Sequence, residues 1–218
     1  MTDSKSMTEN DNTWSGQVAQ YKEDIFFEAT LRNNQISFRT TYGLFSPKAI
    51  DAGTQLLIET LDINSDYDCL DLGCGYGPIG IALSRLAPEG RTLLVDKDYV
   101  AIEYSQHNLE LNGITNADVL LSNGLSKVPG DQLFDVVAMN LPAKIGNELT
   151  TVLFADSFLH LKPGGTLYVV SLAGMRGFIK RSLEGIFGNV DKLKQGKLSA
   201  LTRIGKRVGE IVSTPEEG

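Results

Sequence analysis

The sequence is poor in the residues that form disulfides and metal sites, with only two cysteines and two histidines among 218 residues. Cys69 lies in an apolar run and Cys74 in the glycine-rich turn after it, a close placement that does not favour a disulfide. Reduced thiols are typical of the cytoplasm, so we expect a cytoplasmic protein. Two cysteines without neighbouring histidines also predict no zinc site, and no metal is expected.

Long hydrophobic runs and an excess of positive charge are missing as well. No apolar run approaches the ~20 residues that cross a bilayer, and no apolar signal region opens the sequence, so no membrane contact is expected. The formal net charge of −7 argues against binding nucleic acid through overall charge. What remains is a chain with 42% hydrophobic residues, which suffices for one buried core.

Composition divides the chain into three parts. Residues 1–13 are polar and are expected to form a disordered tail. Residues 14–47 contain short β-like runs, and the runs at 24–31 and 35–40 flank an Asn-rich turn, which predicts a hairpin in an N-terminal β extension. Residues 48–213 carry the pattern of the main domain.

In the main domain, short apolar runs alternate with segments of helical spacing. The predicted strands cover about 67–72, 91–96, 118–122, 134–140 and 166–172. The predicted helices cover about 48–60, 78–87, 98–112, 147–160 and 175–187. Strands that alternate with helices form a parallel, doubly wound sheet, and two consecutive final runs at 189–195 and 198–213 suggest an antiparallel hairpin at one edge. We therefore expect an α/β fold, with a Rossmann-like, mostly parallel, seven-stranded sheet and that edge hairpin.

The first of these strands ends in a glycine-rich turn, Asp71-Leu72-Gly73-Cys74-Gly75-Tyr76-Gly77. Such strand–turn–helix segments hold nucleotide-like cofactors, because glycines let the backbone approach the ligand closely. Residues 75–80 also satisfy the G-x-G-x-x-G pattern of dinucleotide sites. However, Asp71 would repel a pyrophosphate, whereas it suits the amino group and sulfonium of S-adenosylmethionine. Asp96 ends the next strand, where it can accept two ribose hydroxyls, so the two acids favour S-adenosylmethionine.

A second polar group ends the fourth predicted strand, where Asn140, Leu141 and Pro142 follow one another. Ligands collect at the carboxyl ends of strands in open α/β sheets. The Asn140 amide oxygen and the Leu141 carbonyl, stiffened by the proline, form a receptor for a planar amino group. Both would orient its lone pair toward a methyl donor and stabilise the developing positive charge. An ordinary turn would use the same residues.

Residues 42–187 resemble the methyltransferase small domain family of class I S-adenosylmethionine-dependent methyltransferases, which includes ribosomal RNA guanine-N2 methyltransferases of the small-subunit type. Asp71 to Gly77 matches the family's cofactor loop, and Gly43-Leu44-Phe45-Ser46 resembles its segment before the first strand. Leu161-Lys162-Pro163-Gly164-Gly165 resembles its common turn before the fifth strand. The resemblance implies a cofactor site formed by Asp71, Gly73, Cys74, Gly75, Gly77, Asp96, Lys97, Ser122, Asn123, Gly124 and Asn140.

The family's catalytic motif reads Asn-Pro-Pro followed by an aromatic or other apolar residue, and here it reads Asn140-Leu141-Pro142-Ala143. The resemblance implies direct in-line methyl transfer to an exocyclic amino group such as guanine N2 in ribosomal RNA, with catalysis by Asn140, Leu141 and Pro142. Because no aromatic residue ends the motif, a small-molecule or protein-amide substrate stays open, as does a non-catalytic, cofactor-binding role.

Charge near the C-terminus is the hint specific to RNA. Only Glu184 and Asp191 oppose a group of nine basic residues there: Arg176, Lys180, Arg181, Lys192, Lys194, Lys197, Arg203, Lys206 and Arg207. A basic C-terminal face of this kind can contact RNA phosphates, although a solvated helix and hairpin would have the same composition. Phe45 and Arg39 are candidates for the mouth of the site, and Phe45 suits the core equally well. The sequence does not indicate an oligomeric state.

Overall fold

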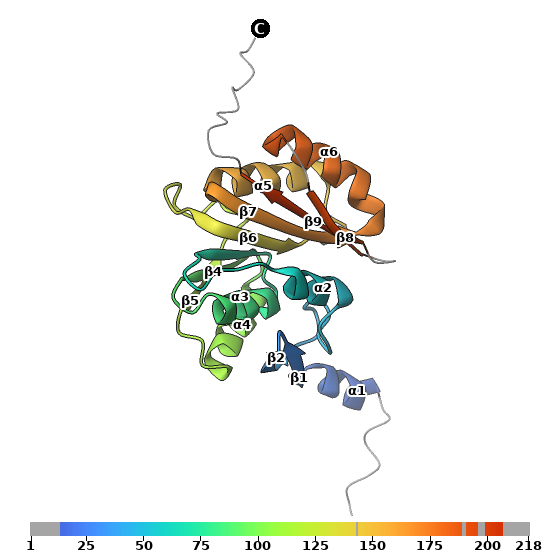
Figure 1. The fold of residues 1–218 in the computed structure, drawn as a ribbon. Coiled ribbons are helices and arrows are strands. Elements are labelled where there is room, and N and C mark those ends of the chain that lie inside the picture. The colour runs from blue at the N-terminus through green and yellow to red at the C-terminus, as the bar shows by residue number, and fades with distance from the viewer. Residues whose placement is uncertain (1–13, 143, 189–190, 196–198, 207–218) are drawn as a thin grey trace, which may run out of the picture.

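The central element is a mixed sheet of seven strands in the order β5-β4-β3-β6-β7-β9-β8 (Figure 1). The computed structural model describes residues 14–142, 144–188, 191–195 and 199–206, so the predicted tail and the end of the predicted domain lie outside the described residues. The strands are β3 Cys69–Leu72, β4 Thr92–Asp96, β5 Ala117–Leu121, β6 Phe134–Asn140, β7 Leu161–Leu172, β8 Asp191–Gln195 and β9 Ser199–Gly205. The pairs among β3 to β7 are parallel, while β9 is antiparallel to both neighbours. The predicted sheet and its edge hairpin are confirmed.

Helices cover both faces of this sheet. They are α2 Ala52–Thr60, α3 Pro78–Leu86, α4 Tyr99–Leu111, α5 Asn147–His160 and α6 Arg176–Phe187, the last preceded by the short 3-10 helix Ala173–Met175. In Figure 1, α5 and α6 lie on one side of the sheet, and α2, α3 and α4 lie on the other. The sheet is therefore doubly wound, with a buried apolar cluster on each face.

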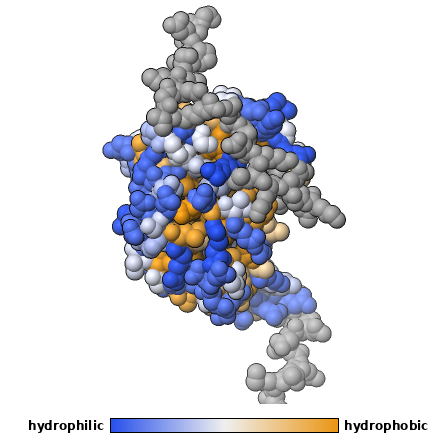
Figure 2. Space-filling model, in the orientation of Figure 1, coloured by the Kyte–Doolittle hydropathy of each residue, from blue (hydrophilic) through white to orange (hydrophobic). Residues whose placement is uncertain are grey.

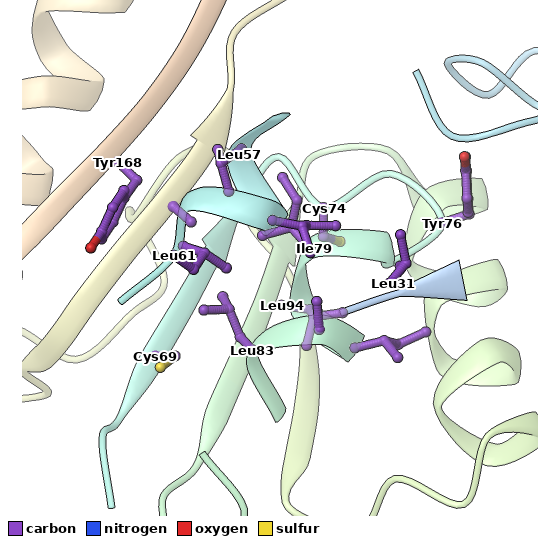
Figure 3. Packing of buried hydrophobic residues seen from close by; sticks show 14 of the residues in the cluster. Leu31, Leu57, Leu61, Cys69, Cys74, Tyr76, Ile79, Leu83, Leu94 and Tyr168 are labelled. Atoms are coloured by element: carbon purple, nitrogen blue, oxygen red, sulfur yellow. The ribbon is translucent and has the colours of Figure 1, made fainter. Parts of the chain in front are cut away.

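On one face of the sheet, α2 packs against β7 and β9, and α3 packs against β3 and β4. Figure 3 shows Leu57 of α2 and its C-cap Leu61 near Ile79 and Leu83 of α3, and all four side chains are buried. Burial of such side chains contributes about 1.5–3 kcal/mol each. Apolar side chains also gather in the middle of the face drawn in Figure 2, between more hydrophilic regions. Within the described ranges, no helix is both long enough and apolar enough to span a membrane.

The N-terminal part differs from the expected β extension at its start. Residues Trp14–Tyr21 form a helix, α1, with no buried residue, whereas β-like runs were expected from residue 14. The predicted hairpin is confirmed as a separate two-stranded sheet of β1 Ile25–Leu31 and β2 Asn34–Thr40. Its two turn residues, Arg32 and Asn33, both have positive φ, which suits the twist of a tight hairpin.

Two asparagines of α4 attach this hairpin to the main domain. Asn108 Oδ1 accepts a hydrogen bond from Arg39 N at 2.8 Å, and Asn108 Nδ2 donates to Arg39 O at 2.9 Å. Asn112 makes the same pair of bonds with Ser37 at 3.0 and 2.8 Å. Asn108 Nδ2 also donates to Tyr76 O at 2.9 Å. The hairpin and the segment after it are thus fixed beside the glycine turn.

Two elements begin more than two residues away from their predicted starts. Helix α2 begins at Ala52 rather than near residue 48, because Asp51 is its N-cap and accepts hydrogen bonds from Gly53 N and Thr54 N at 2.9 and 3.2 Å. Strand β7 begins at Leu161 rather than residue 166, because Leu161 already pairs with Phe134.

Candidate functional site

A cavity of about 710 Å³ opens where β3, β4, β6 and β7 end. Its wall contains the glycine turn after β3, the end of β4, residues 122–124 after β5, and the end of β6. Residues 43–45, the start of α2, the segment 144–146 and two leucines of α5, Leu149 and Leu153, also line it. This volume lies within the range of small-molecule sites, ~300–1,000 Å³.

The glycine turn exposes its backbone to this cavity. Gly73 and Gly75 have φ of +81° and +57°, and a Cβ added to either would meet no atom within 4 Å. Side chains at these positions would adopt a strained backbone and project into the open space. Gly77 is different, because it is the N-cap of α3, does not line the cavity, and would place a Cβ 3.3 Å from Leu94 and Ser105. Gly77 therefore has a packing role in this structure, and its contact with a cofactor stays a prediction.

Asp96 stands at the end of β4 as expected and lines the cavity. Its Oδ2 accepts a hydrogen bond from Gly75 N at 3.0 Å, and its Oδ1 accepts one from Asp98 N at 3.0 Å. These bonds fix the carboxylate beside the glycine turn. Each oxygen keeps a further acceptor position, which suits a pair of vicinal hydroxyls.

Asp71 lies behind the cavity wall rather than on it. Its side chain is fully buried, is not part of the cavity wall, and accepts a hydrogen bond from Gly80 N at 2.7 Å. Burial raises the pKa of this carboxyl to about 7, with the charge of Asp96 adding to the rise and the Gly80 N–H opposing it. In this structure Asp71 organises the start of α3 from behind the turn, and its direct contact with the amino group of a cofactor stays a prediction.

Asn140 ends β6 and is held from the side of α2. Its Nδ2 donates to Thr54 Oγ1 at 2.9 Å and lies 3.3 and 3.4 Å from the two carboxylate oxygens of Asp51. Among the described residues no hydrogen bond involves its Oδ1, and Asn140 lines the cavity. Since a carboxylate only accepts, the nitrogen must face Asp51 and the oxygen is left for a ligand.

The other predicted residues fall on the cavity wall: Lys97, Ser122, Asn123, Gly124, Leu141, Pro142 and Cys74. Leu141 N donates to Val170 O at 2.9 Å, which ties the backbone after β6 to β7. Burial raises the pKa of the Cys74 thiol well above its usual value, so the thiol stays neutral at pH 7. Within the described part of the chain, no group of three or more His, Cys, Asp or Glu side chains can hold a metal ion.

Sequence reasoning missed Asp51 and Thr54 and misplaced Arg39. Asp51 before Ala52 is a helix N-cap signal, but a cap signal does not tell which site the cap faces. Arg39 was a candidate for the mouth of the cavity, yet it pairs with Asp24 and is absent from the wall. Phe45 lines the mouth, and 67% of its surface is exposed.

The chain matches the family model described as methyltransferase small domain over residues 35–201. An uncharacterized Bacillus subtilis protein, YbxB, is 34% identical over 170 residues, which cover 77% of this chain and 84% of that protein. The ribosomal RNA small subunit methyltransferase C of Klebsiella pneumoniae is 35% identical over 158 residues, 70% of this chain and 45% of that protein.

Among solved structures, the chain resembles the T. thermophilus 16S rRNA N2 methyltransferase RsmC, in complex with AdoMet and guanosine. The TM-score is 0.76 at 25% identity, and the match covers 84% of this chain and 50% of that one. The chain thus spans about half the length of the ribosomal RNA methyltransferases that it matches.

Proposed function

The chain belongs to the methyltransferase small domain family and uses S-adenosylmethionine, and from this premise we propose that it methylates guanine N2 in ribosomal RNA. The observation that carries the proposal is the position of Asn140. No described residue bonds to its amide oxygen, which lies in the same cavity wall as the open glycine turn, so an acceptor for an amine and a cradle for a cofactor share one space. The two named rRNA methyltransferases among the relatives support the substrate class.

Residues that line the cavity can bind the ribose and the adenine of S-adenosylmethionine. When bound, this cofactor supplies an electrophilic methyl group on its sulfonium. Asp96 would accept the ribose hydroxyls, and the backbone of Gly73 and Gly75 leaves room for the ligand. Asn123 can bind the adenine amino group from the loop after β5.

Catalysis would come from alignment and charge at the end of β6. The Asn140 Oδ1 and the Leu141 carbonyl accept the two N–H bonds of the target amine, which directs the nitrogen lone pair toward the methyl group. As the nitrogen gains positive charge, these oxygens stabilise it. The alkylated nitrogen is more acidic, so its proton can leave for water after transfer, and no general base is required.

Contact with RNA would use the basic end of α6. Arg176, Lys180 and Arg181 are exposed there, and the helix starts four residues after Leu172, which lines the cavity. Lys206 contributes less than expected, because its Nζ donates to the carbonyls of Phe158 and Leu161. The side chains of Lys192, Lys194, Lys197 and Arg207 lie outside the described residues. A cytoplasmic location is part of the proposal, and both cysteines are free.

The experiment that tests this function is methyl transfer from labelled S-adenosylmethionine to total RNA, total protein and a small-molecule extract, followed by mass spectrometry of the nucleosides. We expect label in small-subunit ribosomal RNA as N2-methylguanosine, and about 100-fold less with Asn140→Ala at unchanged cofactor affinity. Label in protein or small molecules alone would refute the RNA substrate. Cofactor binding without transfer to any fraction would refute enzymatic function.

A charge-reversal variant separates RNA binding from chemistry. Arg176→Glu, Lys180→Glu and Arg181→Glu together should raise KM for RNA and flatten its salt dependence, while cofactor affinity stays the same. An unchanged KM would place the RNA-binding face elsewhere.

A further inference from the structure

The cavity mouth carries an aromatic ring that the catalytic motif lacks. Ala143 stands where the family's motif has an aromatic or other apolar residue, so the wall after β6 supplies no ring. Phe45 and Tyr76 are the aromatic residues among those that line the cavity in the described part of the chain. Tyr76 is buried, whereas 67% of Phe45 is exposed. Phe45 is therefore the ring that a ligand in the mouth can reach.

The segment that presents Phe45 is held in place by its neighbours. Ser46 has φ of +49°, a costly conformation for a residue with a side chain, and its Oγ donates to Ala49 O at 2.7 Å. Thr40 Oγ1 donates to Pro47 O at 2.5 Å. The Tyr76 hydroxyl donates hydrogen bonds to Ser46 O at 3.3 Å and to Ala49 O at 3.4 Å. These bonds link the segment to the glycine turn. Leu44 turns inward, 7% exposed, while Phe45 faces out.

Single exposed apolar side chains are common on protein surfaces, but Phe45 lines the mouth of a cavity, where a bound ligand can cover its ring. A rigid aromatic at the mouth of a cavity whose depth offers amide and carbonyl acceptors suits a flat ligand bearing an amino group. A base that has left its helix fits this description, since it offers a π-face for stacking and an edge for hydrogen bonds.

We propose that Phe45 stacks on the target base and holds its amino group at Asn140. The substrate class is then a purine in a single-stranded or extruded nucleotide. This inference rests on the proposed function and deepens it. The catalytic motif has no aromatic residue, and Phe45, from the segment before α2, takes the place of that ring.

The first test compares Phe45→Leu with Phe45→Tyr on small-subunit ribosomal RNA. Loss of stacking on one base should lower kcat/KM by about 5- to 150-fold in Phe45→Leu, while Phe45→Tyr keeps the ring and stays within about twofold. Cofactor affinity, measured by calorimetry, should be the same in both variants. Wild-type kcat/KM in Phe45→Leu would overturn the proposal while leaving RNA methylation intact.

The second test does not depend on methyl transfer. The chain has one tryptophan, Trp14, which is exposed on α1, so Trp14→Phe provides a background without indole. In that background Phe45→Trp should show saturable fluorescence quenching by guanosine monophosphate with S-adenosylhomocysteine bound. Absence of quenching would overturn the stacking proposal, and it would do so even if the RNA experiment had already failed.

Discussion

The side-chain amide of Asn140 donates from Nδ2 to Thr54 Oγ1 at 2.9 Å, across 86 residues of sequence. Thr54 is in the first turn of α2 and is only 4% exposed. With the Asp51 carboxylate on the same side, the amide nitrogen faces acceptors, whereas no donor among the described residues bonds to the amide oxygen. The start of α2 therefore decides which atom of Asn140 meets a substrate.

Thr54→Val should lower kcat by about 2- to 13-fold, because it removes one hydrogen bond of about 0.5–1.5 kcal/mol that orients the amide. Valine keeps the shape of the side chain, so the fold should be retained. Thr54→Ser keeps the hydroxyl and should recover most of the rate. Steady-state kinetics together with calorimetry of cofactor binding distinguish orientation of the Asn140 amide from a role in cofactor binding. An unchanged kcat in Thr54→Val would show that Thr54 does not position Asn140.

Asp96→Asn should weaken S-adenosylmethionine binding by about 10- to 100-fold, since hydrogen bonds to a charged acceptor contribute about 1.5–3 kcal/mol. Asparagine can still accept the hydrogen bond from Gly75 N, so the turn itself should survive. Calorimetric titration of the cofactor is the measurement. Asp118→Asn is a control, because that acid is exposed and pairs with Arg91 away from the cavity. Equal affinities for the two variants would reject the ribose role.

Asp71→Asn should change how stability depends on pH. The folded chain raises the pKa of this carboxyl from 3.8 to about 7, so the folded state binds the proton more tightly than the unfolded state. Its contribution to stability is full below pH 4 and is lost as pH rises through 7. The loss is at most about 4 kcal/mol.

Asparagine cannot titrate, and it can still accept the hydrogen bond from Gly80 N. Urea unfolding at pH 5 to 8 should therefore show a smaller fall in stability with pH for Asp71→Asn than for the wild type. Parallel curves for the two proteins would show that Asp71 is already ionised in the folded state at neutral pH.

Gly80→Ala should destabilise the fold by about 1–3 kcal/mol, because overpacking a filled core forces side chains to move. A Cβ on Gly80 would lie 2.4 Å from Leu94 Cγ, and Leu94 is fully buried. Gly130→Ala is the matched control, since a Cβ there meets nothing within 4 Å and the position is exposed. Thermal or urea unfolding compares them. A Gly80→Ala protein as stable as the control would mean that Leu94 can repack.

Local patterns in the sequence were reliable where one element contains the whole signal. Helix α5 and strand β6 match their predicted ranges, because helical spacing and a long apolar run are complete within each segment. Asp98, the first residue of the predicted range 98–112, caps α4, since a cap bonds only to the residues that follow it. The prediction for residues 14–21 was wrong. The apolar residues of α1 are exposed, so the sequence there lacks the apolar face by which a buried helix is recognised.

The sequence by itself determined the order of strands and helices, the glycine turn and the strand-end residues Asp96 and Asn140, because these depend on neighbours along the chain. Only the tertiary structure decided that Asp71 is behind the cavity wall, that Asp51 and Thr54 stand beside Asn140, and that Phe45 faces the mouth. Those outcomes depend on how α2 and the hairpin pack against the sheet, and packing between distant segments leaves no local pattern in the residues concerned.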